Sequence, residues 1–116
     1  MRDPNCLFCK IVSGEEPATK VWENGEFMAI KNKYPVAAVH LLVMPKEHVT
    51  KSGHFSGSTE KGFWDKIMAA IFGVIGLTGL SKTGYKLVNN GAGYNHFDHE
   101  HIHVLGGTKE EPVGKT

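Results

Sequence analysis

The segment His99-Glu100-His101-Ile102-His103-Val104-Leu105 places a histidine at every second position. Successive side chains of a β-strand point to opposite faces, so the three imidazoles would share one face, with about 6.6 Å between neighbours. Burying three imidazoles demands three sets of hydrogen-bond partners, because an unpaired buried polar group costs free energy. The pattern therefore favours a chemical use of this row over simple packing.

Three uses of the histidine row are compatible with the residues alone. The first is a polar strand face that is solvated by water. The second is a metal site. The third is chemistry on an anion, in which a neutral imidazole attacks phosphorus and its neighbours donate hydrogen bonds to phosphate oxygens. Nearby glycines would let backbone N–H groups approach an anion, although turn geometry explains them equally well: Gly91, Gly93, Gly106 and Gly107.

The size and composition of the chain are those of an ordinary globular domain. Its 116 residues suit a single domain over 1–116, with 41% hydrophobic and 22% charged residues. The formal net charge of +1 excludes a strong field over the whole molecule. We therefore expect neither a nucleic-acid partner nor attachment to an anionic membrane.

The sequence predicts a cytoplasmic protein. Its longest apolar run, 67–80, is shorter than the ~18–20 residues that span a bilayer, and glycines interrupt it. The polar N-terminus leads into no signal-peptide core. In the cytoplasm, the pair Cys6 and Cys9 is more plausible as metal ligands or redox thiols than as a disulfide.

The remaining sequence predicts an α+β domain with a five-stranded antiparallel sheet, one short helix and one long helix. Asn5 would cap the short helix through about Val12, and Ser58 or Thr59 would cap the long one. An Asn24-Gly25 turn predicts a hairpin, and Pro45 ends a buried strand. The predicted helices are 6–12 and 63–75, the predicted strands lie within 21–30 and at 39–44, 85–89 and 99–105, and 108–116 is a flexible tail.

The histidine row and its flanks resemble the signature of the histidine triad (HIT) family. His99-x-His101-x-His103 is followed by Val104-Leu105-Gly106-Gly107, and three further segments match in order and spacing: 6–11, 39–49 and 87–91. The resemblance covers nearly the whole chain. It is nearest to the branch of small purine nucleoside phosphoramidases, which implies the HIT fold and pairing into a homodimer.

The resemblance implies a role for each histidine near the reacting phosphorus. His101 would be the nucleophile and would form a nucleotidyl-histidine, which water then hydrolyses to a nucleoside monophosphate. His103 would bind the phosphoryl oxygens and help to protonate the leaving group. His40 would orient the His101 ring, and Asn89 would donate to the phosphate. Alternatively, His40 is a core histidine and Asn89 closes a turn.

The resemblance also places the nucleoside. Leu7, Phe8 and Ile11 match positions that flank a purine base, although core packing explains them too. Asn32 stands where the family has a carboxylate for the ribose hydroxyls. Before the triad, the phosphoramidase branch has an amide and a small polar residue. Here Asn95 would keep the amide role, whereas His96 adds a fourth imidazole near the phosphate, and 108–112 contains no Trp. These departures leave the leaving group open.

The resemblance further implies a zinc site. Cys6 and Cys9 provide two thiolates, and tetrahedral zinc needs two more ligands. In related proteins the other two match His48 and His99, so we expect a structural Zn²⁺ that ties the first helix to the sheet. The alternative is a pair of reduced buried cysteines, with His99 orienting a neighbour.

The expected function is hydrolysis of nucleoside 5′-phosphoramidates or related nucleotide conjugates. A dinucleoside polyphosphate hydrolase or nucleotidyltransferase of the same superfamily is an alternative, since Asn32-Lys33-Tyr34-Pro35 is similar to those branches. A module that binds nucleotide or metal without catalysis is another. It would not need Asn89 or Gly106-Gly107.

Overall fold

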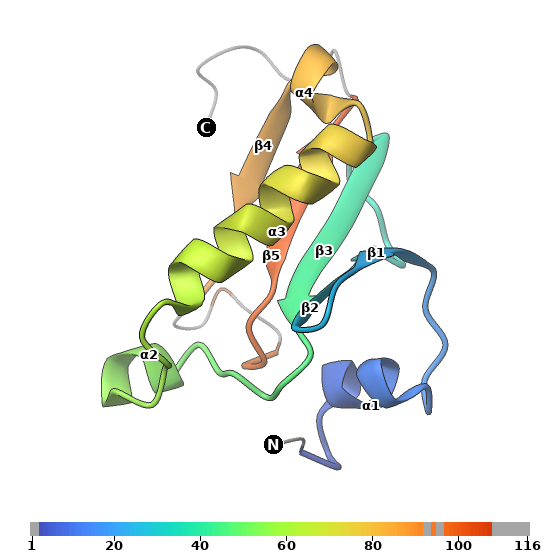
Figure 1. Ribbon diagram of the computed structural model, residues 1–116. Helices are drawn as coiled ribbons and strands as arrows, with labels where there is room; N and C mark the ends of the chain where they lie inside the picture. The colour runs from blue at the N-terminus through green and yellow to red at the C-terminus, as the bar shows by residue number, and fades with distance from the viewer. Residues whose placement is uncertain (1–2, 92–93, 95–96, 108–116) are drawn as a thin grey trace.

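The computed structural model describes residues 3–91, 94 and 97–107. It contains four helices and five strands within those residues (Figure 1). The helices are α1 (Leu7–Ser13), α2 (Gly53–Ser56), α3 (Phe63–Leu77) and α4 (Leu80–Thr83), and the strands are β1 (Lys20–Glu23), β2 (Phe27–Lys31), β3 (Val39–Pro45), β4 (Tyr85–Val88) and β5 (Ile102–Gly106). Asn95, His96 and the tail 108–116 lie outside the described residues.

The five strands form one antiparallel sheet in the order β1-β2-β3-β5-β4. This arrangement confirms the predicted α+β class and the five-stranded sheet. Strand β5, which carries the end of the histidine row, lies between β3 and β4 and pairs Leu42 with His103. A central strand is hydrogen-bonded on both sides, so its side chains are held in fixed directions.

The hairpin between β1 and β2 follows the prediction. The Asn24 side-chain oxygen accepts hydrogen bonds from the backbone N–H groups of Glu26 and Phe27, at 2.9 and 2.8 Å. This Asx turn closes the chain reversal that brings β2 against β1.

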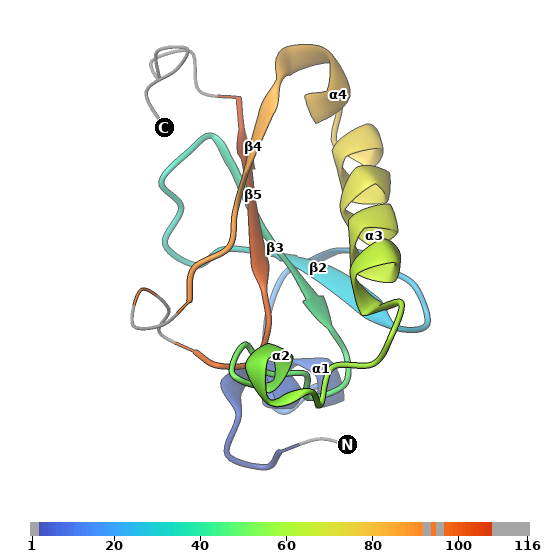
Figure 2. The same cartoon turned by 90° about the vertical axis from the view of Figure 1, so that its left-hand side faces the viewer.

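The long helix α3 covers one face of the sheet (Figures 1 and 2). Ile67, Ile71 and Val74 recur at helical spacing and are fully buried against Val43 and Val104 of the sheet. Each such side chain contributes about 1.5–3 kcal/mol of burial free energy. Gly73 faces the Trp22 indole, and a Cβ at this position would lie 3.5 Å from the ring, which is ordinary van der Waals contact.

A second, smaller core lies on the opposite face of the sheet. Met28, Ile30, Leu42 and Met44 alternate with the residues that face α3, and they pack against Phe8 of α1. Because side chains alternate along a strand, one sheet supports two apolar layers. The short helix α1 is thus held beside the face to which the histidines point.

Several predicted boundaries were wrong for local reasons. Helix α1 is capped by Cys6, whose sulfur accepts from the Cys9 N–H at 3.4 Å, and not by Asn5. Helix α3 begins at Phe63 as predicted, but Gly62 is its N-cap in place of Ser58 or Thr59, and the Thr59 hydroxyl contacts His54. Two one-turn helices, α2 and α4, were not predicted, because their segments contain no periodic apolar residues.

The last strand also begins later than predicted. Regular pairing starts at Ile102, whereas His99 forms an isolated bridge with Thr50. The Glu100 N–H donates to the Val49 carbonyl at 2.7 Å. The segment before β5 is therefore held by the chain that follows β3.

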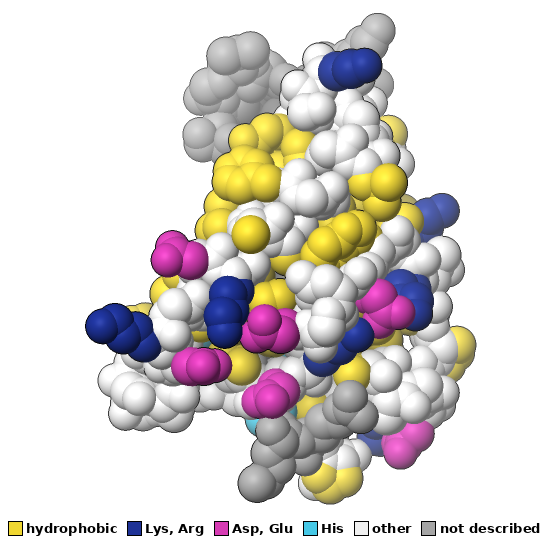
Figure 3. Space-filling view, viewed as in Figure 1, with side chains coloured by type: hydrophobic (Ala, Val, Ile, Leu, Met, Phe, Trp, Pro, Cys, Tyr) yellow, Lys and Arg dark blue, Asp and Glu magenta, His cyan; other side chains and the backbone are white. Residues whose placement is uncertain are grey.

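The outward face of α3 remains partly apolar. Trp64, Phe72 and Leu77 are exposed, and hydrophobic side chains gather over α3 in the space-filling view (Figure 3). Among the described residues, no helix has both the length and the apolar character that a bilayer crossing requires.

Candidate active site and metal centre

The three histidines of the row lie on the sheet face that carries α1. The Phe8 ring packs against His99 and His101, with centroids 5.6 and 4.9 Å away. The His101 and His103 rings follow one another at 5.4 Å. The intervening Ile102 belongs to the core beneath α3. The alternation of side chains along the chain thus brings the three imidazoles together, as the sequence predicts.

His101 is held in one tautomer. Its Nδ1 lies 2.8 Å from the backbone oxygen of His99, and a carbonyl oxygen only accepts, so Nδ1 carries the proton. In the neutral ring, the lone pair is then on Nε2. The ring is buried between Phe8 and His103, which fixes the direction of that lone pair. This geometry suits a nitrogen nucleophile.

His40 and His103 form a relay whose proton positions follow from one backbone group. The Val36 N–H donates to Nδ1 of His40 at 3.1 Å, so the proton of the neutral His40 ring is on Nε2. That Nε2 donates to Nδ1 of His103 at 2.8 Å. The proton of His103 is therefore on Nε2, from which it can donate a hydrogen bond to a ligand.

Both rings of the relay are neutral at pH 7. Burial lowers the pKa of His40. Burial, together with the neighbouring charges of His101, His40 and Lys51, lowers the pKa of His103 to about 4. A neutral His103 donates a hydrogen bond without itself repelling the cationic form of His101.

Four side chains converge on a possible metal position: Cys6, Cys9, His48 and His99. Their ligand atoms all lie within 4.8 Å of one another. Nδ1 of His99 is 3.3 Å from Sγ of Cys6, and Nδ1 of His48 is 3.3 Å from Sγ of Cys9. Ligands of tetrahedral zinc, bound at about 2.0–2.3 Å, are separated by about 3.3–3.8 Å. The donor set and its spacing fit zinc.

The protons of this cluster are compatible with metal binding. Nε2 of His99 donates to the Pro45 carbonyl at 2.9 Å, which leaves a lone pair on Nδ1 toward the sulfurs. Burial lowers the pKa of His99 to about 4, so the ring is neutral. Burial raises the pKa of the Cys9 thiol. A bound cation would offset that cost by stabilising the thiolate.

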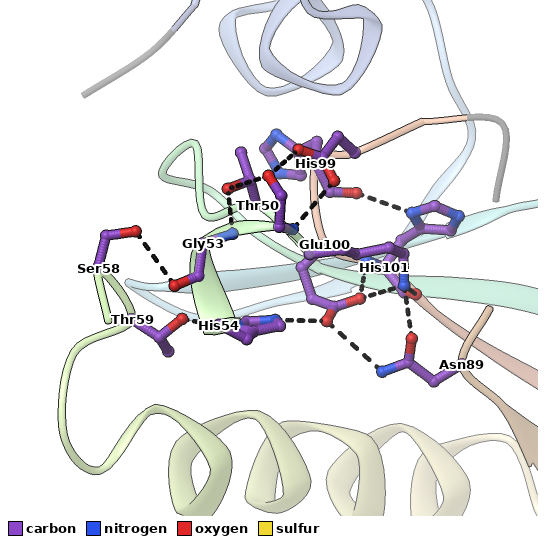
Figure 4. Close-up of polar contacts among 12 residues, drawn as sticks. Thr50, Gly53, His54, Ser58, Thr59, Asn89, His99, Glu100 and His101 are labelled. Carbon is purple, nitrogen blue, oxygen red and sulfur yellow. Dashed lines mark hydrogen bonds and ion pairs between the residues drawn. The ribbon is translucent and has the colours of Figure 1, made fainter. Parts of the chain in front are cut away.

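A polar network lies behind the row, on the other side of the chain (Figure 4). Nζ of Lys51 donates to Glu100 Oε1 and to Asn89 Oδ1, both at 2.5 Å. His54 Nε2 lies 2.7 Å from Glu100 Oε2. Burial would raise the pKa of Glu100, but hydrogen bonds from Lys51 and His54 hold it below its usual value.

This network is the part of the site that we did not predict from the sequence. Glu100 alone carried a signal, because the alternation that places the histidines on one face places Glu100 on the face of Ile102 and Val104. A carboxylate there needs a buried partner. The sequence did not indicate that this partner is Lys51, because Lys51 lies in a segment without apolar periodicity.

The structure also shows where most of the residues expected to bind the nucleotide lie. Leu7 and Ile11 are partly exposed on α1, and Phe8 is buried beneath the ring of Phe97 at 5.1 Å. The Asn32 amide nitrogen lies 3.2 Å from His40 Nε2, but both nitrogens carry protons in this tautomer, so the two groups are in contact without a hydrogen bond. The Asn32 oxygen accepts from the Tyr34 N–H. The Asn89 side chain joins the network behind the row. Asn95 and His96 lie outside the described residues.

Comparisons with known proteins agree on one family. A family model described as "Scavenger mRNA decapping enzyme C-term binding" matches residues 5–63. An uncharacterized HIT-like protein of Chlamydia muridarum is 40% identical over 108 residues, which is 87% of this chain and 80% of that protein.

Solved structures share the fold over almost their full length. A histidine triad protein from Clostridium difficile superposes with a TM-score of 0.84 at 32% identity, covering 97% of this chain and 98% of its own. A HIT family hydrolase from Legionella pneumophila gives 0.80 at 35% identity, with 92% and 96% covered. A Zn-bound histidine triad family protein from Mycobacterium smegmatis gives 0.76 at 25% identity, with 96% and 81% covered.

Proposed function

Since the chain belongs to the histidine triad family, we propose that it is a nucleotide hydrolase that acts on purine nucleoside 5′-phosphoramidates or related nucleotide conjugates. The observation that carries the proposal is the tautomer of His101. Its Nδ1 proton is committed to the His99 carbonyl, so the Nε2 lone pair is the nucleophile.

The reaction proceeds in two displacements. His101 Nε2 attacks the α-phosphorus, a P–N bond to the nucleotide forms, and the bond from phosphorus to the leaving group breaks. The leaving amine takes the bonding electron pair and a proton from solvent, while the neutral His103 keeps its proton and donates a hydrogen bond from Nε2–H to the reacting phosphoryl group. Water then attacks the same phosphorus, one of its protons passes to solvent, and the nucleoside monophosphate and neutral His101 are released.

The remaining expected residues position the substrate. Leu7, Phe8 and Ile11 would flank the base, and Asn32 would bond the ribose hydroxyls as a neutral partner. Asn89, Asn95 and His96 would contact the phosphate region. In this assignment Asn89 would turn from Lys51 toward the substrate.

A structural zinc ion accompanies this proposal. Cys6, Cys9, His48 and His99 would hold it, and it would tie α1 to the segment after β3 and to the segment before β5. The ion would stabilise the wall that Phe8 forms beside His101 without taking part in the chemistry.

The deciding experiment is mass spectrometry after a rapid quench with an adenosine 5′-phosphoramidate. We expect an adenylyl group on His101 and its absence from His101→Gly, which should still bind the nucleotide. Undiminished hydrolysis by His101→Gly would refute the nucleophile. A preference for a diadenosine polyphosphate would select the related hydrolase or transferase activity, and failure of a nucleotide to bind would favour a non-catalytic module.

We also propose a homodimer formed through the outward face of α3, where Phe72 and Leu77 are exposed. Light scattering at micromolar concentration should give twice the mass of the chain. The substitution Phe72→Glu should reduce it to the monomer mass. A wild-type monomer would remove the dimer from the account.

A further inference from the structure

The peptide groups of His101 are held by side chains and lie just before the regular strand. Strand β5 begins at Ile102. The His101 N–H donates to Oε1 of Glu100 at 2.9 Å, and Nζ of Lys51 lies 3.4 Å from the His101 carbonyl oxygen (Figure 4). Both contacts come from the side of the chain opposite to the His101 ring.

Glu100 is itself fixed from several directions. Lys51 Nζ binds its Oε1 at 2.5 Å, and His54 Nε2 lies 2.7 Å from its Oε2. Asn89 Nδ2 lies 3.5 Å from the same Oε2. With Glu100 only 1% and Lys51 only 5% exposed, the carboxylate has little freedom to move.

Two backbone hydrogen bonds set this pair in register. The Lys51 N–H donates to the Asp98 carbonyl at 2.7 Å, and the Glu100 N–H donates to the Val49 carbonyl at 2.7 Å. Ser52 adds a hydroxyl bond to the Asp98 carboxylate at 2.5 Å. The segment after β3 therefore places Lys51 beside Glu100, just before the regular strand pairing of β5 begins.

We propose that Glu100 and Lys51 are positioning residues for His101. They hold its peptide groups so that Nδ1–H keeps its hydrogen bond to the His99 carbonyl and Nε2 points to the substrate. The inference rests on the proposed function, since it takes His101 as the reacting group. Rotation of the peptide between Glu100 and His101 would move the ring and release the tautomer. A misplacement of 1 Å at a reacting group can cost about 10²-fold in rate.

Stability alone is a poor reason for this pair. Taking two charges out of water costs about as much as their attraction returns, so an apolar pair of similar volume would serve packing as well. An apolar pair would not, however, accept the His101 N–H. The pair is thus explained by what it does to the neighbouring peptide.

Two double variants separate positioning from packing. Lys51→Met with Glu100→Met removes both charges and the acceptor while it keeps the volume. Lys51→Met with Glu100→Gln also removes both charges, but the Gln oxygen can still accept the His101 N–H. We expect the Met/Met protein to lose about 10–10²-fold in kcat with KM within about threefold, and the Met/Gln protein to keep kcat within about threefold. Circular dichroism and thermal unfolding check that both fold.

A spectroscopic readout makes the test independent of turnover. Long-range ¹H–¹⁵N spectra of the imidazoles should show His101 with its proton on Nδ1 in the wild type and in Met/Gln, and a mixture of tautomers in Met/Met. Wild-type kcat and an unchanged tautomer in a folded Met/Met protein would overturn the proposal, as would equal losses in both variants.

Two further measurements apply if the Met/Met protein does not fold or if no nucleotidyl adduct forms. If Met/Met does not fold, Glu100→Gln alone is used. The backbone amide proton of His101 should then shift upfield because a carboxylate acceptor has become a neutral one, and an unshifted resonance would overturn the proposal. If the wild type forms no nucleotidyl adduct, the proposed function fails, while the tautomer and amide signals still decide whether Glu100 and Lys51 position His101.

Discussion

His40 donates a hydrogen bond from Nε2 to Nδ1 of His103 across 2.8 Å, and this single contact decides where the proton of His103 lies. The two residues are neighbours in space because β3 and β5 pair side by side. Their orientation begins with the Val36 N–H, which occupies Nδ1 of His40. A backbone group outside the strands thus sets the direction of the hydrogen-bond donor that the substrate meets.

Breaking this relay should impair catalysis more than binding. In His40→Leu, Nδ1 of His103 loses its donor, so His103 can place its proton on either nitrogen. We expect kcat to fall about 10²-fold, because losing one preorganised hydrogen-bond donor to the reacting group costs about that much. In His40→Gln the amide can still donate to His103, and kcat should recover most of the loss. Steady-state kinetics measure both, and equal activity of His40→Leu and wild type would contradict the relay.

The depressed pKa of His103 predicts a pH-dependent stability. The folded ring has a pKa of about 4, whereas the unfolded chain has the ordinary value near ~6.5. Between these values the unfolded state binds more protons, so the free energy of unfolding should fall as the pH drops from about 6.5 to about 4. One such group contributes at most about 1.4 kcal/mol per pH unit. Urea unfolding at several pH values gives the slope.

The matched variant for this slope is His103→Gln, which keeps a polar side chain and does not titrate. It should unfold with a shallower dependence on pH over the same range, because one of the proton-binding differences is gone. A slope as steep as that of the wild type would assign the effect to other groups, such as the buried His40.

Protein purified without a polyhistidine tag should contain about one zinc ion per chain. A strong chelator should lower Tm by several degrees, because the unfolded chain lacks the assembled site and the free energy of zinc binding therefore stabilises the folded state. In Cys9→Ser the zinc content should drop and the chelator should lose most of its effect on Tm. Metal-free wild-type protein with two free thiols would contradict the zinc site.

Truncation of the core beneath α3 should be costly. Ile71 is fully buried between α3 and the sheet, so Ile71→Ala should destabilise the protein by about 2–5 kcal/mol through lost burial and a residual cavity. Lys66 lies on the same helix but is exposed, and its ion pair with Glu26 spans 3.5 Å. Lys66→Ala should therefore cost less than about 1 kcal/mol. Chemical denaturation of the two variants compares the costs directly, and similar values would place Ile71 outside the core.

Much of the architecture was predictable because it rests on local patterns. The Asn24-Gly25 turn, the apolar periodicity of α3 and the run before Pro45 each report on a few neighbouring residues, and all three elements are present. The boundaries were less predictable. Gly62 and Cys6 are the N-cap residues of α3 and α1, whereas the expected cap Thr59 contacts His54 and the backbone N–H of Asn5 donates to Asp3.

The sequence by itself determined that His99, His101 and His103 share a face, because alternation along an extended chain is a local property. It also determined the α+β class, through the order of its apolar patterns. Only the tertiary structure decided the proton positions on His40, His101 and His103, since each depends on a carbonyl, amide or ring that another segment supplies. It alone also decided that Lys51 meets Glu100, because the two residues are 49 positions apart in the sequence and no local pattern encodes a contact over such a distance.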